Sequence, residues 1–369
     1  MNKLPTLYGA DKNKGYKTWS VFTEEDTITV THGKLDGKLQ TKTTVCKGKN
    51  IGRANATTDE EQAISEAQSK WNKQKDKYYR ETLEEVDTLS TEGVMLAQDY
   101  TKKPNFLEDS FYASRKLDGL RCKSVYKDGV LTWNSRGGKT YPVPPHLVEP
   151  LTHLHKVSGL EQLDGECYVH GFKLQSIQSA VKKHNTLTSS LTYEIFDIPL
   201  ENVKWVDRLG VLTNLEQYTN SMTHVNIVEN IKSTKEDLQK LITQFISEGF
   251  EGVMLRNAKK GDYAFQNKRS NDLLKYKLFE DSECKILSCV EDKNAQGKFT
   301  VGWTNPNGVY VEFELSMNGD QDENAYTNLK NKIGAFVNFK YQDLTIDGKP
   351  SFARGLYFRE CTEGGIPLE

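Results

Sequence analysis

The stretch Ser114-Arg115-Lys116-Leu117-Asp118-Gly119-Leu120-Arg121 holds a Lys-x-Asp-Gly-x-Arg core between apolar runs. A lysine amine attacks phosphorus only when neutral, and an ordinary pKa of about 10.4 leaves roughly one in a thousand neutral near pH 7.4. Arg121, a bound metal and partial burial would each lower the pKa of Lys116. Lys116 is therefore a candidate nucleophile, and Asp118 a candidate to orient a sugar hydroxyl or Lys116 itself. Taken alone, the stretch is equally typical of a charged strand end and a turn.

Two later stretches contain charged residues whose spacing has chemical meaning. In Leu163-Asp164-Gly165-Glu166 the two acids alternate along an expected strand, so their side chains share one face. Mg²⁺ takes one or two carboxylates with phosphate oxygens and water, and Glu166 can supply one of them. Lys275 and Lys277 are two apart on another expected strand, so they point the same way. Each stretch alone is as typical of an edge turn, or of lysines that guard an edge strand.

The overall composition places limits on the kind of protein. The formal net charge is -2, with 49 basic and 51 acidic residues, so a basic groove for nucleic acid would have to be local. The six cysteines form no Cys-x-x-Cys pair, which indicates free thiols in a reducing compartment and disfavours a zinc module. No run approaches 18 apolar residues. We expect a cytoplasmic protein, with a monomer as the default.

The N-terminal region predicts a small sheet followed by a helix. Residues 16 to 50 alternate apolar and polar, with Asp36-Gly37 as a hairpin signal. The run Thr57-Thr58-Asp59-Glu60-Glu61 predicts a helix start, with Ala63, Ile64, Ala67 and Trp71 on one side of the helix.

The rest of the chain predicts two more units. Strands and helices alternate from 111 to 280, including a helix over 172 to 184 that ends near Lys182 and Lys183, and a helix over 233 to 248 capped by Ser233. Five short β-type runs and one helix then follow from 284 to 359, a pattern that suits an OB-fold barrel.

Six ordered blocks between about residues 112 and 360 make coincidence untenable, and together they resemble the motifs of the covalent nucleotidyltransferases. Within that superfamily the chain is similar to ATP-dependent DNA ligases of the small phage or viral type. The resemblance implies an α+β fold with an N-terminal module over 1–86, an adenylation domain over 87–280 and an OB-fold domain over 281–369. The N-terminal region looks like a degenerate WGR-type module, which is expected to contact DNA.

The resemblance also implies roles for individual residues. Lys116 would attack the ATP α-phosphorus and carry AMP, which passes to the 5′-phosphate of a nick in double-stranded DNA before the 3′-hydroxyl displaces it. Glu166 and Glu251 would hold Mg²⁺, and Phe196 would stack on adenine. The remaining expected nucleotide contacts are Ser114, Asp118, Arg121, Arg136, Lys275, Lys277, Arg354 and Arg359, and the expected DNA contacts are Lys182 and Lys183.

Two departures from the ligase pattern leave questions open. Many ligases have a glutamate at the position of Ser114 to recognise the adenine amine, so adenine selection must rely on another group. The acidic-basic pair that often ends the last motif is Glu360-Cys361 here, so the pyrophosphate contacts are uncertain.

Four alternative functions share parts of this sequence pattern. RNA ligases and mRNA capping guanylyltransferases share the lysine chemistry, although the OB-type C-terminus disfavours most RNA ligases. A non-catalytic nucleic-acid clamp would be expected to lack a motif residue, yet Lys116, Glu166, Glu251, Lys275 and Lys277 are all present. An NAD-dependent ligase is disfavoured by the N-terminal region and by the cysteine pattern.

Overall fold

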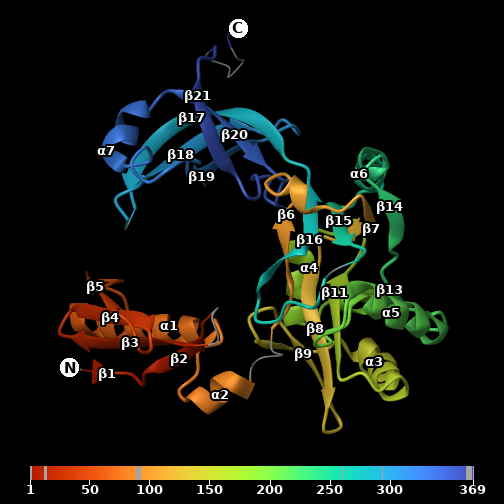
Figure 1. Cartoon of the computed structure of the whole chain (residues 1–369). Coiled ribbons are helices and arrows are strands. Elements are labelled where there is room, and N and C mark those ends of the chain that lie inside the picture. The colour runs from red at the N-terminus through yellow and green to blue at the C-terminus, as the bar shows by residue number, and fades with distance from the viewer. Residues whose placement is uncertain are drawn as a thin grey trace.

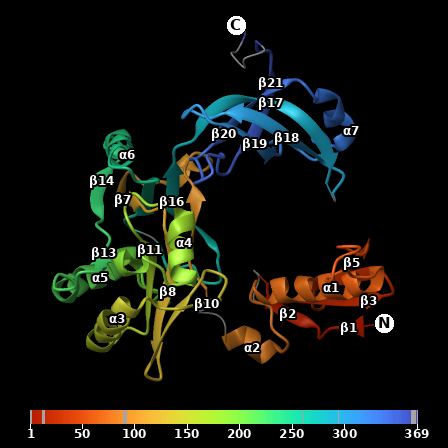
Figure 2. The same ribbon diagram turned by 180° about the vertical axis from the view of Figure 1, so that it is seen from behind.

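The computed structural model describes residues 2–11, 15–88, 93–259, 261–292, 294–362 and 368. The chain forms three successive parts, and the first and last lie on the same side of the larger central part (Figures 1 and 2). Sheets and helices are mixed throughout, which confirms the predicted α+β fold. No helix among the described residues is both long and apolar enough to cross a membrane.

The N-terminal part is an antiparallel sheet covered by one long helix. Its strands are β1 (Asn2–Lys3), β2 (Leu7–Ala10), β3 (Tyr16–Glu24), β4 (Thr27–Lys34) and β5 (Leu39–Val45), and the helices are α1 (Asp59–Lys75) and α2 (Leu83–Thr88). The predicted hairpin joins β4 to β5, and Thr58 caps α1 in the predicted way, through a capping box with Glu61. Ala63 and Ala67 are buried against the sheet, whereas Ile64 is exposed and was wrongly expected on the buried side. The WGR-like assignment stays a prediction.

The central part contains two sheets, and a cavity opens between them. The six-stranded sheet has the order β10-β9-β8-β11-β12-β13 and the five-stranded sheet the order β14-β7-β15-β16-β6. Most pairs are antiparallel, but β12 pairs with β13, and β16 with β6, in parallel.

The bounds of the central elements follow the predicted alternation of strands and helices. The strands are β6 (Leu96–Asp99), β7 (Ser110–Lys116), β8 (Leu120–Lys127), β9 (Val130–Asn134), β10 (Thr140–Tyr141), β11 (Gln162–Tyr168), β12 (Thr192–Asp197), β13 (Val225–Ile227), β14 (Ile231–Thr234), β15 (Gly252–Asn257) and β16 (Arg269–Lys277). The helices are α3 (Pro145–Ser158), α4 (Leu174–Lys182), α5 (Trp205–Thr219) and α6 (Leu238–Ser247), with 3-10 turns η1 (Pro104–Phe106) and η2 (Thr188–Ser190). Ser233 does not cap α6, because it is buried in β14 opposite Phe111.

The C-terminal part is a strongly curved five-stranded sheet in the order β19-β18-β17-β20-β21 (Figure 1). Its elements are β17 (Glu280–Glu291), β18 (Gly297–Thr304), β19 (Tyr310–Leu315), α7 (Tyr326–Leu329), the 3-10 turn η3 (Lys330–Lys332), β20 (Phe336–Tyr341) and β21 (Arg354–Arg359). A parallel bridge between Met317 and Gly355 brings the two edges together. This connectivity is compatible with the predicted OB-fold.

An aromatic cluster forms the core of the C-terminal part. The ring of Phe339 lies 5.3 Å from Trp303 and 5.3 Å from Phe313, and none of its surface is exposed. We expect Phe339→Ala to lower the free energy of unfolding of this part by about 3–5 kcal/mol, because it leaves a cavity. Val290→Ala, at a position 54% exposed, should change it by less than about 0.5 kcal/mol. Urea unfolding followed by tryptophan fluorescence checks this, and equal midpoints for the two variants would contradict it.

Candidate active site

Lys116 lies where the chain passes from one central sheet to the other. It ends β7 in the five-stranded sheet, and after three residues β8 begins in the six-stranded sheet. The turn between them is tight at Gly119, where an added Cβ would lie 2.5 Å from the Cys167 carbonyl oxygen and 2.6 Å from Cγ of Glu166. Gly119 is therefore required for the close approach that brings β11 beside Lys116.

The register of the five-stranded sheet places the predicted lysines side by side. Lys116 pairs with Gly252, and Gly252 pairs with Lys277 on the next strand. An added Cβ at Gly252 would lie 2.1 Å from the carbonyl oxygen of Tyr276, so only glycine fits between the two strands. The backbone N–H of Glu251 also donates to the Lys116 carbonyl at 3.0 Å, which brings this acid to the same end of the sheet.

A cavity of about 680 Å³ opens between the two sheets and holds most of the predicted nucleotide contacts. The predicted residues that line it are Ser114, Lys116, Arg121, Arg136, Glu166, Phe196 and Lys275. Residues that the resemblance implied, from five separate strands and one turn, therefore meet at one cavity.

Glu251 holds the two lysines together at the edge of this cavity. One of its carboxylate oxygens is ion-paired with Lys116 and the other with Lys277. Gln342 of the C-terminal part completes the cluster: its side-chain N–H donates to Glu251 at 2.5 Å, and its oxygen accepts from Lys277 at 2.9 Å. A side chain from another part of the molecule thus contacts the partners of Lys116.

Burial and charge change the acidity of this cluster. Burial raises the pKa of Glu251, but Lys116 and Lys277 outweigh it, so the pKa stays below its usual range. Burial, and then the neighbouring Lys277 and Lys116, lower the pKa of Lys275. Burial and the charge of Lys116 also lower the pKa of Lys277. Lys275 and Lys277 therefore lose their protons more readily than exposed lysines do.

The donor set fits a single Mg²⁺ ion with Glu166 as its first ligand. Burial raises the pKa of Glu166 to about 7, against the opposing effect of Lys116. In the part of the chain that the structure describes, the Glu166 carboxylate has no hydrogen-bond or ion-pair partner and borders the cavity. Among the described residues, no three His, Cys, Asp or Glu side chains gather in a way that could hold a metal ion.

Arg121 is held by an acid rather than left free for phosphate. Its guanidinium donates to both oxygens of Asp164, at 2.9 and 2.5 Å, and to the carbonyl oxygen of Met95 at 2.9 Å. It also lies 5.1 Å from the ring centroid of Phe196. Tyr263, which the sequence did not identify, donates to Asp164 at 2.5 Å. The ion pair between Arg121 and Asp164 therefore holds the guanidinium against the ring of Phe196.

Several predicted residues do not line the cavity. Asp118 lies near the Lys116 cluster, and its pKa is raised first by burial and then by Glu251. Arg359 of β21 donates to Glu283 of β17, two strands away, at 3.1 Å, and Arg354 is exposed on β21. Lys182 and Lys183 are exposed at the end of α4, and only the earlier residues Leu174 and Gln178 of that helix border the cavity.

Two site residues from the C-terminal part were not predicted. Gln342 follows β20 in a run that gave no chemical signal. Phe352 lies two residues before the predicted contact Arg354 but was given no role, and its ring lines the cavity 5.4 Å from the Lys277 ammonium. The loop from 342 to 352 therefore covers the Lys116 end of the cavity.

A buried ion cluster lies behind the wall of the cavity that carries Phe196. Asp197 follows Phe196 and has no exposed surface; it accepts from Arg208 at 2.7 Å and pairs with Arg256 at 2.7 Å. Arg256 itself borders the cavity, although the sequence gave it no role. Burial raises the pKa of Asp197, but Arg256 and Arg208 outweigh it and leave the pKa below its usual value.

We expect Asp197→Asn to destabilise the protein by about 3–5 kcal/mol at pH 7, because two buried arginines lose their counter-ion. The Asp197 charge stabilises the fold fully above the unfolded-state pKa of about 3.9, and this is lost as the pH falls through the lower folded-state pKa. The stability gap between wild type and variant should therefore narrow below about pH 3.9. Urea unfolding at several pH values measures it, and a constant gap would contradict the assignment.

Comparison with known proteins agrees with this geometry. Residues 94–277 match the family described as ATP dependent DNA ligase domain. A DNA ligase of African swine fever virus (isolate Warthog/Namibia/Wart80/1980) is 28% identical over 302 residues, covering 76% of this chain and 66% of the viral protein. The chain thus spans about two thirds of the length of that viral relative.

A shorter relative and a solved structure cover more of their own length. A DNA ligase of Haemophilus influenzae is 26% identical over 282 residues, covering 74% of this chain and 93% of the bacterial protein. A solved structure from work on Lig E DNA ligases superposes with a TM-score of 0.59 and 26% identity, covering 73% of this chain and 99% of the other.

Proposed function

This chain belongs to the ATP-dependent DNA ligase family, and from that premise we propose that it seals nicks in duplex DNA through an AMP group carried on Lys116. The observation that carries the proposal is the position of Lys116, which borders the cavity together with Glu166, Phe196 and Lys275. We also propose that the protein works as a monomer in the cytoplasm.

In the first step, the neutral amine of Lys116 attacks the α-phosphorus of ATP. A nitrogen–phosphorus bond forms, the bond to the bridging oxygen breaks, and pyrophosphate leaves. Lys116 is ion-paired with Glu251, so it must first give up both this contact and a proton. Lys275 and Lys277 carry positive charge close to Lys116. Once Lys116 is neutral, the two remaining lysines can neutralise charge on the α-phosphate.

The adenine is expected to stack on Phe196, whose ring is held by Arg121. Ser114 lies in one register row with Met254 and Lys275, so its short side chain borders the cavity without reaching across it. Adenine selection then rests on backbone groups and on the shape of the cavity wall.

Mg²⁺ would be held by Glu166 and, once Lys116 has released it, by Glu251. When bound, the ion polarises the phosphate oxygens and offsets their charge. Glu251 thus has two roles in sequence, first as the partner of the Lys116 ammonium and then as a metal ligand.

In the later steps, AMP passes from Lys116 to the 5′-phosphate at the nick, and the 3′-hydroxyl displaces it. The loop from 342 to 352 covers the Lys116 end of the cavity, so it must move aside before a nick can reach Lys116. RNA ligase and guanylyltransferase chemistry would begin in the same way, and they are separated by nucleotide and strand preference.

We expect Lys116→Ala to abolish covalent labelling by α-labelled ATP, because no other residue supplies the nucleophile. Denaturing gels after incubation with ATP and Mg²⁺ measure the label, and nicked duplex DNA added afterwards should discharge it. Lys156→Ala, on the surface of α3, is the matched control and should label normally. Labelling by GTP, or transfer only to RNA, would favour a sister class; labelling of Lys116→Ala would remove Lys116 as the nucleophile.

We expect Glu251→Gln to slow labelling by at least about 10-fold, because an amide cannot replace a carboxylate beside two lysines and a metal. The loss should be larger at low Mg²⁺, since one ligand is missing. Single-turnover labelling at several Mg²⁺ concentrations measures both effects. Glu216→Gln, exposed on α5, serves as the control, and a variant as fast as that control would contradict the role of Glu251.

A further inference from the structure

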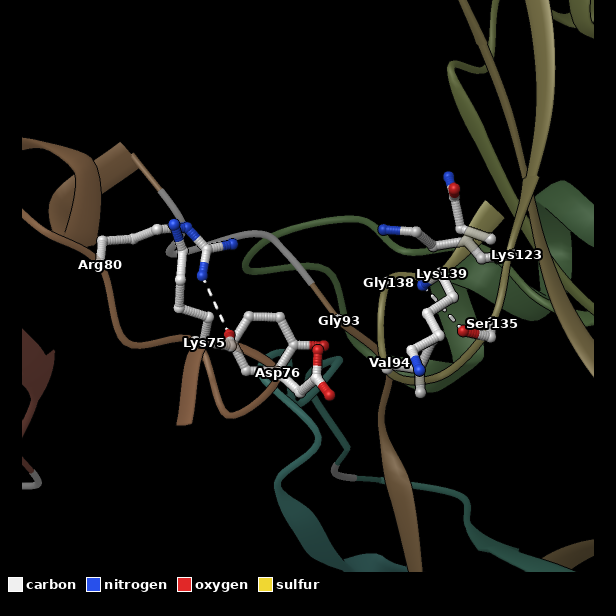
Figure 3. A pocket seen from close by; sticks show the side chains of 12 residues that line it. Lys75, Asp76, Arg80, Gly93, Val94, Lys123, Ser135, Gly138 and Lys139 are labelled. Atoms are coloured by element: carbon white, nitrogen blue, oxygen red, sulfur yellow. Dashed lines mark hydrogen bonds between the residues drawn. The ribbon is translucent and has the colours of Figure 1, made fainter. Parts of the chain in front are cut away.

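A second cavity, of about 420 Å³, lies between the N-terminal part and the central part (Figure 3). Its lining residues come from the end of α1 and the segment after it, and from β8 and the turn around Gly138: Lys75, Asp76, Tyr78, Arg80, Gly93, Val94, Lys123, Asn134, Ser135, Gly137, Gly138 and Lys139. The two parts are held together here, since the Tyr78 hydroxyl donates to the Arg136 carbonyl at 3.2 Å. We call this cavity the interdomain cleft.

The charged side chains of the interdomain cleft are mostly cationic. Lys75 and Arg80 approach from the N-terminal part, and Lys123 and Lys139 from the central part, as Figure 3 shows. Asp76 is the one acid among the described lining residues. Lys75 is also paired with Glu81 at 2.9 Å, so its charge is partly compensated. A ligand between the two sides would therefore be an anion.

Backbone contacts fix the position of Arg80 on the N-terminal side of the interdomain cleft. The Arg80 guanidinium donates to the carbonyl oxygens of Lys75 and Tyr79, at 3.0 and 2.8 Å, so it is fixed without a carboxylate partner among these contacts. Its backbone is paired with Tyr8 of β2 through two hydrogen bonds, of 2.8 and 2.7 Å. The folded N-terminal sheet thus holds the positive charge of Arg80 in a fixed position.

The opposite side of the interdomain cleft is a turn whose backbone a ligand can approach closely. An added Cβ at Gly137 or Gly138 would meet nothing within 4 Å, so the space over both glycines is open. Gly138 has a φ of +81°, which favours glycine. Lys139 follows at once and is exposed.

The interdomain cleft adjoins the nucleotide cavity at the turn that carries Arg136. Ser135 and Gly137 line both cavities, and Arg136 between them projects to the nucleotide side. An extended anion that enters beside Arg136 would therefore pass over this turn and reach Lys139 and Arg80. A free phosphate or nucleotide would not need both sides, whereas a phosphodiester backbone presents repeated charges along such a path.

We infer that the interdomain cleft binds the phosphodiester backbone of the DNA substrate, so that the N-terminal part shares in holding the nicked duplex. This inference rests on the proposed ligase function and adds a binding surface to it. Contacts of this kind are independent of base sequence and weaken as salt rises.

The test is binding of a fluorescent nicked duplex to the full chain, without ATP or Mg²⁺, at salt from 50 to 200 mM. We expect Lys139→Ala and Lys75→Gln each to reduce the slope of log affinity against log salt by about 1. Over this range, each lost contact should make the fall in affinity about threefold smaller. Lys240→Ala, exposed on α6 away from the cleft, is the matched control and should keep the wild-type slope (Figure 1).

Melting temperatures of the variants check that they fold. Wild-type slopes in the Lys139 and Lys75 variants would overturn the inference and leave the ligase proposal intact if ATP labelling and nick binding persist. A raised ATP requirement with an unchanged slope would also overturn it, because the cleft would then serve nucleotide phosphates. A wild-type chain that neither labels with ATP nor binds the nick would instead contradict the ligase proposal itself.

Discussion

The ion cluster around Glu251 is the constraint on which the site depends. A single carboxylate sits between the Lys116 and Lys277 ammonium groups, and it can do so because Gly252 lets three strands meet without side chains in the way. Three charges this close are stable only when each has a partner. Glu251 therefore keeps Lys116 positioned through their ion pair. Catalysis requires that this pairing be exchanged for phosphate and metal contacts.

The same cluster connects chemistry to the movement of the C-terminal part. Gln342 binds both Glu251 and Lys277, Lys173 pairs with Asp343, and Phe352 lies against Lys277. The loop is joined to the cavity by few contacts, whereas each part is stabilised by its own apolar core. The loop can therefore separate from the cavity without unfolding either part. The arrangement covers Lys116 when the nucleotide is to be attacked and can expose it when a nick must approach.

The sequence predicted those features that depend on local pattern. Alternation identified the strands that carry Glu166 and Lys275, and the capping signal at Thr58 predicted the start of α1. The sequence could not predict partners that meet only through the fold. Arg121, an expected nucleotide contact, pairs with the buried Asp164, and Gln342 reaches the site from another part of the chain. The helix start expected at Ser233 was wrong because pairing of β14 with β7 buries that residue, and tertiary contacts outweigh a capping signal.

The central claim is that Lys116 carries the nucleotide, and mass spectrometry of the intact chain after incubation with ATP and Mg²⁺ tests it most directly. The account predicts a mass increase of one adenylyl group that peptide mapping places on Lys116, with an acid-labile nitrogen–phosphorus bond. It also predicts that nicked duplex DNA removes the adduct. An unmodified chain, or an adenylyl group on a different residue, would contradict the account.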